Sequence, residues 1–171
     1  MGRAEWFENQ IDELYPRLHR SMTAYLAGTP VEADDILQET FLTAYKIIFH
    51  VAANTDIYTW LYTIARNRCI DEFRKQKHNQ KRSNRSVDEF QLAAEPGPED
   101  EQSEDLHMLR KAIAELPELL RSIVVMKTID GLSYPEISTI TGVNEQTLKN
   151  RMFRARKELA ESLKEKGIKR V

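Results

Sequence analysis

Residues 133–159, SYPEISTITGVNEQTLKNRMFRARKEL, constrain the fold of this chain more than any other stretch. Ser133 and Glu136 have the spacing of a capping box, and Pro135 falls in the first helical turn, where a missing N–H costs nothing. After a tight turn, Asn144 can cap a second helix, because its side chain accepts from backbone N–H groups of the first turn. The stretch therefore predicts a short helix, a turn and a longer helix.

The longer helix has two chemically different faces. Apolar residues recur at helical spacing and should face a core: Leu148, Met152, Ala155 and Leu159. The other face carries cationic and amide side chains and one aromatic ring: Lys149, Asn150, Phe153, Arg154 and Lys157. A basic face with an exposed ring suits entry into a DNA major groove, so the stretch indicates a helix-turn-helix.

The formal net charge of −2 conceals blocks of opposite sign. Residues 66–85 carry eight Lys or Arg against two acids, whereas residues 88–105 carry eight acids and no base. The chain from residue 149 onward is basic again, with nine Lys or Arg. Such blocks predict separate surfaces with separate partners, which the average charge does not reveal.

Several classes of protein are disfavoured by what the sequence lacks. Its longest apolar run, residues 123–126, is far shorter than the roughly 20 residues of a membrane span, and its N-terminal residues are polar. Cys69 is the one cysteine, which excludes an internal disulfide and a cysteine-ligated zinc site. The histidines are scattered, and no Gly-rich phosphate loop is present. We expect a cytoplasmic protein without membrane insertion, cofactor, metal or enzymatic activity.

The other periodic stretches also predict helices, and no stretch alternates like a strand, so we expect an all-α fold. The first helix should span about 5–27, where Pro16 favours a kink or a break. Thr29-Pro30-Val31-Glu32 has the pattern of a second capping box, opening a helix that ends near residue 48. A third helix should run from Asp56 or Thr55 to about residue 78.

The composition then divides the chain into two small helical domains, residues 1–82 and 106–171. Residues 83–105 between them lack a helical period, contain Pro96-Gly97-Pro98 and are rich in acids. This composition predicts a flexible acidic linker.

Two helix faces in the first domain are candidate binding surfaces. The outer face of the second helix combines carboxylates, an amide and an apolar side chain: Asp35, Gln38, Glu39 and Leu42. It suits protein docking, although Leu42 is equally compatible with an ordinary exposed leucine. On the third helix, Tyr58, Tyr62 and Arg66 are spaced four apart outside the core stripe. Such a ridge could stack unpaired bases, but two tyrosines in a small bundle more often complete its packing.

Two segments resemble one family. EADDILQETFLTAY followed by WLYTIARNRCIDEFRK resembles domain 2 of bacterial sigma factors of the extracytoplasmic-function (ECF, group IV) class. LPELLRSIVVMKTIDGLSYPEISTITGVNEQTLKNRMFRARKEL resembles their domain 4. The order, the acidic linker and the length agree with the family. The resemblance implies an alternative sigma factor that directs promoter-specific initiation by core RNA polymerase under the control of an anti-sigma factor.

The resemblance also implies roles for the matching positions. The outer face of the second helix, Asp35, Gln38, Glu39 and Leu42, would bind the clamp helices of the polymerase β′ subunit, and the β flap would be a further contact of the chain on core polymerase. The −10 promoter element would be bound by His50, Asn54, Tyr58, Tyr62, Arg66, Asn67, Arg74 and Lys75. The −35 element would be bound by Lys149, Asn150, Arg151, Phe153 and Arg154. Trp60 matches a family tryptophan that we interpret mainly as core.

The chain departs from the family pattern at Asn150, where Ser is frequent. Asn can read adenine bidentately, so this change bears on promoter sequence and not on the fold.

Two other functions fit parts of the sequence. A stand-alone repressor or activator would use the helix-turn-helix alone and bind a palindromic duplex tightly without polymerase. A sigma-mimicking adaptor would titrate an anti-sigma factor through the same surfaces but would not start transcription. Run-off transcription with core polymerase separates these alternatives.

Overall fold

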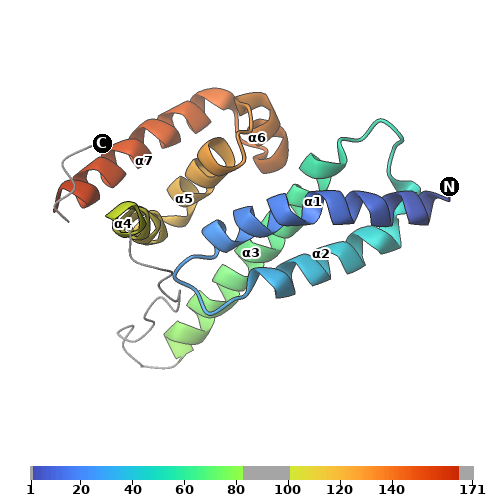
Figure 1. The fold of residues 1–171 in the computed structure, drawn as a ribbon, viewed down its shortest axis with the longest axis horizontal. Helices are drawn as coiled ribbons and strands as arrows, with labels where there is room; N and C mark the ends of the chain where they lie inside the picture. Colours follow the sequence, from blue (N-terminus) through green and yellow to red (C-terminus); the bar gives the residue numbers. More distant parts are fainter. Residues whose placement is uncertain (1, 83–100, 166–171) are drawn as a thin grey trace. The chain divides into compact units, whose positions relative to one another are not determined.

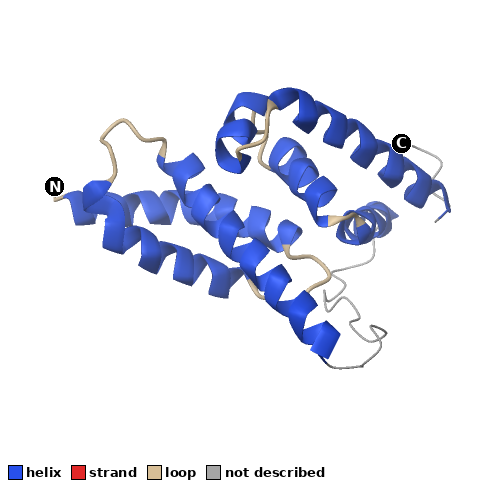
Figure 2. Ribbon diagram, turned by 180° about the vertical axis from the view of Figure 1, so that it is seen from behind, coloured by secondary structure: helices blue, strands red, loops and turns tan. Residues whose placement is uncertain are grey.

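The computed structural model describes residues 2–82 and 101–165, which form helices and connecting turns with no strand among them (Figures 1 and 2). The expected all-α fold is confirmed. The chain forms two compact units, Met1–Thr23 with Val31–Asp88 (unit 1) and Ala24–Pro30 with Glu89–Val171 (unit 2). None of the described helices is long and apolar enough to cross a membrane.

Unit 1 is a bundle of three helices, α1 (Arg3–Tyr25), α2 (Ala33–Ile47) and α3 (Ile57–Arg82), with a 3-10 turn, η1 (Ile48–His50), after α2 (Figure 1). Its core joins α1 to α3. The rings of Phe7 and Trp60 lie 6.3 Å apart, and the sulfur atoms of Met22 and Cys69 lie 3.7 Å apart. Cys69 is fully buried, whereas Trp60, interpreted from the sequence as mainly core, is half-buried.

Of the kink or break expected at Pro16, the break does not occur, because α1 continues through Pro16. Proline removes one backbone hydrogen bond, but tertiary packing can override a local preference. Here Pro16 is exposed, while Leu18 and Met22 beyond it are fully buried. Burial of the residues that follow holds the chain in the helix.

The capping box predicted at Thr29-Pro30-Val31-Glu32 is wrong. Helix α2 begins at Ala33, and Glu32 is its N-cap without a side-chain hydrogen bond. The hydroxyl of Thr29 instead donates to the carbonyl of Leu26 at 2.7 Å. This hydroxyl therefore closes the turn after α1 and does not start α2.

Helix α3 begins where the sequence indicated. The Asp56 carboxylate accepts from the backbone N–H of Tyr58 at 3.1 Å and from the hydroxyl of Thr59 at 2.5 Å. An acidic cap satisfies a free N–H of the first turn and favours the positive end of the helix dipole. The helix extends to Arg82, past the predicted end near residue 78.

Unit 2 contains α4 (Glu101–Glu115), α5 (Glu118–Val124), α6 (Tyr134–Thr141) and α7 (Glu145–Glu165). Helix α5 continues into a π-helical turn, η2 (Val125–Ile129), in which the N–H of Asp130 reaches the carbonyl of Val125. Helix α7 packs against α4, α5 and α6. Helix α4 begins inside the stretch predicted as linker, and residues 83–100 of that stretch lie outside the described residues.

Arg121 ties several carbonyl groups together inside unit 2. Its guanidinium donates to the carbonyls of Ala27 at 3.0 Å and Leu116 at 3.3 Å, and also to that of Ala114. These groups follow or end helices, where carbonyls lack helical partners. Burial lowers the pKa of Arg121 from its ordinary value, although an arginine stays charged at physiological pH.

Candidate nucleic-acid and protein interfaces

Helices α6 and α7 form the predicted helix-turn-helix, and its local signals are confirmed. Ser133 and Glu136 make the reciprocal capping box at the start of α6. Gly142 ends α6 with a φ of 69°, a left-handed conformation that favours glycine. The side chain of Asn144 accepts from the backbone N–H of Thr147 at 2.9 Å and caps α7. Short-range hydrogen bonds therefore fix both helix starts and the turn.

The packing of α7 decides which of its faces is exposed. Leu148, Met152 and Ala155 are buried as predicted, and Leu159 is half-buried. The residues expected to contact −35 DNA lie on the opposite side, where Lys149, Asn150, Phe153 and Arg154 are exposed and Arg151 is half-buried. Phe153 is 72% exposed, although a phenylalanine ring is apolar and is usually buried. The face combines positive charge with an apolar ring.

Three residues that were not predicted from the sequence also belong to this face: Lys127, Tyr134 and Gln146. Two ammonium groups approach the ring of Tyr134, with Lys127 Nζ 5.2 Å and Lys149 Nζ 5.6 Å from its centre. Gln146 Nε2 donates to Asn150 Oδ1 at 3.2 Å. The four-residue spacing of Gln146 and Asn150 was visible in the sequence, whereas the approach of Lys127 to Tyr134 depends on packing.

The outer face of α2 is exposed, as expected. Asp35, Gln38, Glu39 and Leu42 all lie on the surface, and Leu42 is 58% exposed. Two further large apolar side chains are exposed, Tyr45 on α2 at 45% and Phe49 in η1 at 60%, and we call these two residues and Leu42 the apolar strip. Several large apolar side chains close together on a surface are typical of a protein interface. Tyr45 and Phe49 could have been found from their spacing of three and seven residues after Leu42.

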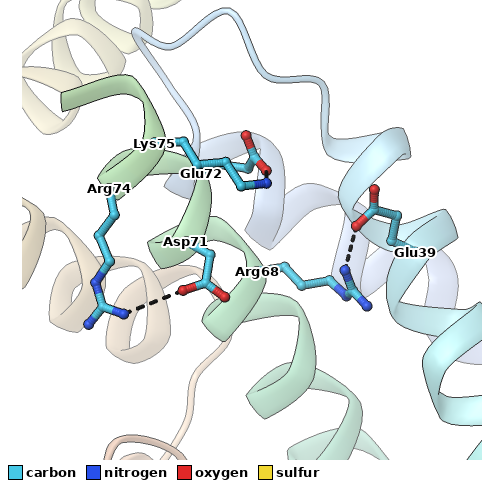
Figure 3. Close-up of a pocket in the computed structure, with 6 residues that line it drawn as sticks. All are labelled: Glu39, Arg68, Asp71, Glu72, Arg74 and Lys75. Atoms are coloured by element: carbon cyan, nitrogen blue, oxygen red, sulfur yellow. Dashed lines mark hydrogen bonds and ion pairs between the residues drawn. The ribbon is translucent and has the colours of Figure 1, made fainter. Parts of the chain in front are cut away.

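Arg68 connects this face of α2 to α3 at the edge of a hollow of about 350 Å³ (Figure 3). Its guanidinium donates to the carboxylate of Glu39 and to the hydroxyl of Thr43. Figure 3 shows Arg68 reaching from α3 toward Glu39 on α2. One of the expected polymerase-binding carboxylates is therefore held by a cation of the same chain.

The other residues around the hollow form ion pairs along α3. Arg74 lies 3.4 Å from Asp71, and Lys75 hydrogen-bonds Glu72, which raises the pKa of Lys75 (Figure 3). Both cations were expected to bind the −10 element, where a cation can pair with DNA phosphates. Exposed ion pairs are weak, so these pairs could exchange for phosphates at little cost.

The residues expected to bind the −10 element differ in their exposure to solvent. His50, Asn54 and Asn67 are exposed, and Arg66 is half-buried. Tyr58 and Tyr62 are only 7% and 1% exposed, so of the two alternatives for this ridge the structure shows completion of the bundle packing and not an outward stacking surface.

Arg17 of α1 lies against Tyr58, and Tyr58 in turn lies next to Tyr62 in the bundle. The guanidinium of Arg17 lies 3.7 Å from the centre of the Tyr58 ring, and the two tyrosine rings are 5.8 Å apart. The ridge contributes to the bundle interior, so these rings do not offer a stacking surface in this structure. Among residues 2–82 and 101–165, there is no cluster of three or more His, Cys, Asp or Glu side chains that could bind a metal ion.

The exposed face of α7 and its capped turn define a helix-turn-helix protein. Comparison with known families gives two matches: residues 10–79 match Sigma-70 region 2, and residues 106–159 match Sigma-70, region 4. The chain belongs to the ECF sigma factors of the sigma-70 family.

Individual relatives agree with this assignment. The ECF RNA polymerase sigma factor SigW of Bacillus subtilis is 32% identical over 90% of this chain and 84% of its own. SigM of the same organism is 31% identical over 92% of this chain and 97% of its own. A solved structure of the sigma factor RpoE with the anti-sigma factor NepR from Bartonella quintana covers 95% of this chain and 99% of its own, with 25% identity and a TM-score of 0.74.

Proposed function

We propose that this protein is an alternative sigma factor that binds core RNA polymerase and directs promoter-specific transcription initiation. The observation that carries the proposal is the exposed basic and aromatic face of a capped helix-turn-helix, in a chain that also matches region 2. The functional division that we propose is residues 1–82 for polymerase and the −10 element, 83–105 as linker, and 106–171 for the −35 element.

For the −35 element, α7 would enter the major groove. Asn150 and Arg154 carry donors that can reach base edges, and Phe153 offers apolar contact to a thymine methyl group. Lys149 is suited to phosphates, which position the protein without reading sequence. Arg151, being half-buried, would contact the backbone next to the groove.

For the −10 element, we propose that exposed residues of the loop and of α3 bind the opened strand: His50, Asn54, Asn67, Arg74 and Lys75. Arg66 would assist from its half-buried position. Tyr58 and Tyr62 would support this surface from inside the bundle, because their rings are covered. A single strand is held in part through its phosphates, and the cations among these residues suit that role.

For core polymerase, we propose that the outer face of α2 binds the β′ clamp helices. The strip of Leu42, Tyr45 and Phe49 would supply the apolar centre of this interface, and Asp35, Gln38 and Glu39 its polar rim. Unit 2 would meet the β flap. Control by an anti-sigma factor is proposed because the related RpoE was solved with NepR.

Run-off transcription tests the function directly. The purified chain is added to core polymerase with a library of randomised promoters. Promoter-specific initiation is expected, with selected sequence at two sites, near −35 and −10. Tight binding to a palindromic duplex without polymerase would instead support a stand-alone regulator. Binding to polymerase without initiation would support an adaptor.

Leu42→Asp tests the polymerase surface. A carboxylate at the centre of an apolar contact loses burial and is desolvated without a partner, so we expect at least about a 10-fold loss of affinity for a β′ clamp-helix fragment. Leu106→Asp is the matched control, because Leu106 is 52% exposed but lies on α4. Equal affinities for the two variants would contradict the assignment.

A further inference from the structure

Two exposed amide side chains in the first turns of α7 are joined to each other. Gln146 and Asn150 lie four residues apart on one helix face, and Gln146 Nε2 donates to Asn150 Oδ1 at 3.2 Å. Both side chains belong to the exposed face opposite the buried Leu148 and Met152. A side chain that contacts Asn150 here is in a position to control how its amide is presented to DNA.

In the arrangement seen here, the hydrogen bond leaves the nitrogen of the Asn150 amide as the end that is free to point outward. An Asn side chain reads adenine bidentately only if its oxygen accepts from the adenine N6 amino group while its nitrogen donates to N7. In this structure the oxygen of Asn150 faces Gln146, which turns its nitrogen away from Gln146. When the Asn150 nitrogen faces outward, it can donate to a base whose major-groove edge presents acceptors. Guanine has two neighbouring acceptors, N7 and O6, in the major groove.

We propose that Gln146 is a positioning residue that orients Asn150 to donate, so that the base pair facing Asn150 is selected for guanine over adenine. This inference rests on the proposed function, because it assumes that α7 reads −35 DNA. It adds a residue and a base preference that the helix-turn-helix alone does not determine.

The strength of such orientation depends on water. On an exposed helix in solution, a pair of this kind changes side-chain populations by only about twofold. When DNA excludes water from the face, the same hydrogen bond becomes stronger, because the local dielectric falls. We therefore expect Gln146 to contribute about three- to tenfold to the guanine-to-adenine ratio, at or below the lower end of what one direct base contact contributes.

The experiment replaces Gln146 in two ways and measures base preference in run-off transcription with core polymerase and a randomised −35 element. Gln146→Ala frees the Asn150 oxygen, so the guanine-to-adenine ratio should fall. Gln146→Glu offers only acceptors, so the Asn150 nitrogen should turn toward the carboxylate and its oxygen outward. That variant should favour bases with an amino group, adenine or cytosine, and give the lowest ratio of the three proteins.

Further variants separate orientation from other effects. Asn150→Ala should abolish the preference at this base pair, and adding Gln146→Ala to it should change nothing more. Lys149→Ala should weaken binding without changing the ratio, and thermal unfolding should show that every variant is folded. A change of preference by Gln146→Ala in the Asn150→Ala background would show that Gln146 reads a base itself, which would overturn the positioning role.

An unchanged ratio in both Gln146 variants would also overturn the inference. An unchanged ratio can be told apart from failure of the proposed function. If the proposed function were wrong, the wild-type chain itself would give no promoter-specific initiation with core polymerase. Promoter-specific initiation by the wild type together with an unchanged ratio would reject only the role of Gln146.

Discussion

At the residue scale, a few polar side chains determine where the recognition helix can begin. The backbone N–H of Ser133 donates to Glu136 at 2.7 Å, and the backbone N–H of Glu136 donates back to Ser133 at 3.3 Å. Gly142 then turns the chain and Asn144 starts α7. The direction of the exposed face of α7 therefore depends on these few residues.

Ser133→Ala should lower the free energy of unfolding of unit 2 by about 1 kcal/mol, because one cap hydrogen bond is lost. Urea denaturation followed by circular dichroism measures the loss. Thr139→Ala is the control, since Thr139 is exposed within α6 and its hydroxyl donates only to the carbonyl of Pro135 four residues earlier. Equal stability of the two variants would contradict a stabilising capping box.

Gly142 allows a test of backbone conformation without steric clash. A Cβ built on Gly142 meets no atom within 4 Å, but the residue has a φ of 69°. Gly142→Ala should therefore cost about 1–2 kcal/mol through backbone strain alone, and Gly142→Asn should cost less, because Asn tolerates this conformation. Denaturant unfolding of both variants measures the difference. An alanine variant as stable as the asparagine variant would contradict this explanation.

At the scale of the elements, α2 and α3 are joined by one arginine across the proposed polymerase face. Arg68 contacts both Glu39 and Thr43, one turn apart on α2. The side chains of Arg68 and Glu39 are 30% and 63% exposed, so water screens their attraction. The pair should therefore orient Glu39 more than it stabilises the bundle.

A double-mutant cycle of Arg68→Met and Glu39→Gln should give a coupling energy of at most about 1 kcal/mol in unfolding of unit 1. Methionine retains much of the apolar stem of arginine, so lost packing is kept small. Denaturant unfolding of the four proteins provides the measurement. A coupling energy above about 2 kcal/mol would show that the pair acts as a buried network.

At the scale of the whole molecule, a net charge of −2 coexists with a basic recognition helix. Local charge and not the average governs contact with DNA, because salt screens charges beyond about 10 Å at 0.1 M. Lys149 illustrates the local balance, since it lies 3.8 Å from Glu145 and must exchange this partner to bind a phosphate.

Lys149→Ala should reduce the salt dependence of promoter binding, lowering the slope of log K against log salt by about one. Asn150→Ala should leave the slope unchanged and alter base preference instead, because it makes no phosphate contact in the proposal. Fluorescence anisotropy of labelled promoter DNA with holoenzyme, over a range of salt concentrations, measures both. A reduced slope for Asn150→Ala would reverse the two assignments.

The sequence by itself determined the features that arise within a few residues along the chain. The capping box at Ser133, the turn at Gly142 and the cap at Asp56 were predictable, because each involves partners two to four residues apart. The periodicity of α7 likewise predicted its buried side, Leu148, Met152 and Ala155.

The tertiary structure decided the features that depend on distant segments. The sequence pattern at Thr29 resembled the capping box at Ser133. The Thr29 hydroxyl nevertheless donates to the carbonyl of Leu26, because α2 begins only at Ala33. Tyr58 is buried with Arg17 of α1 against its ring, and Arg68 meets Glu39 across 29 residues of sequence. Spacing along one helix shows which residues share a face, but only packing decides whether that face meets solvent or another helix.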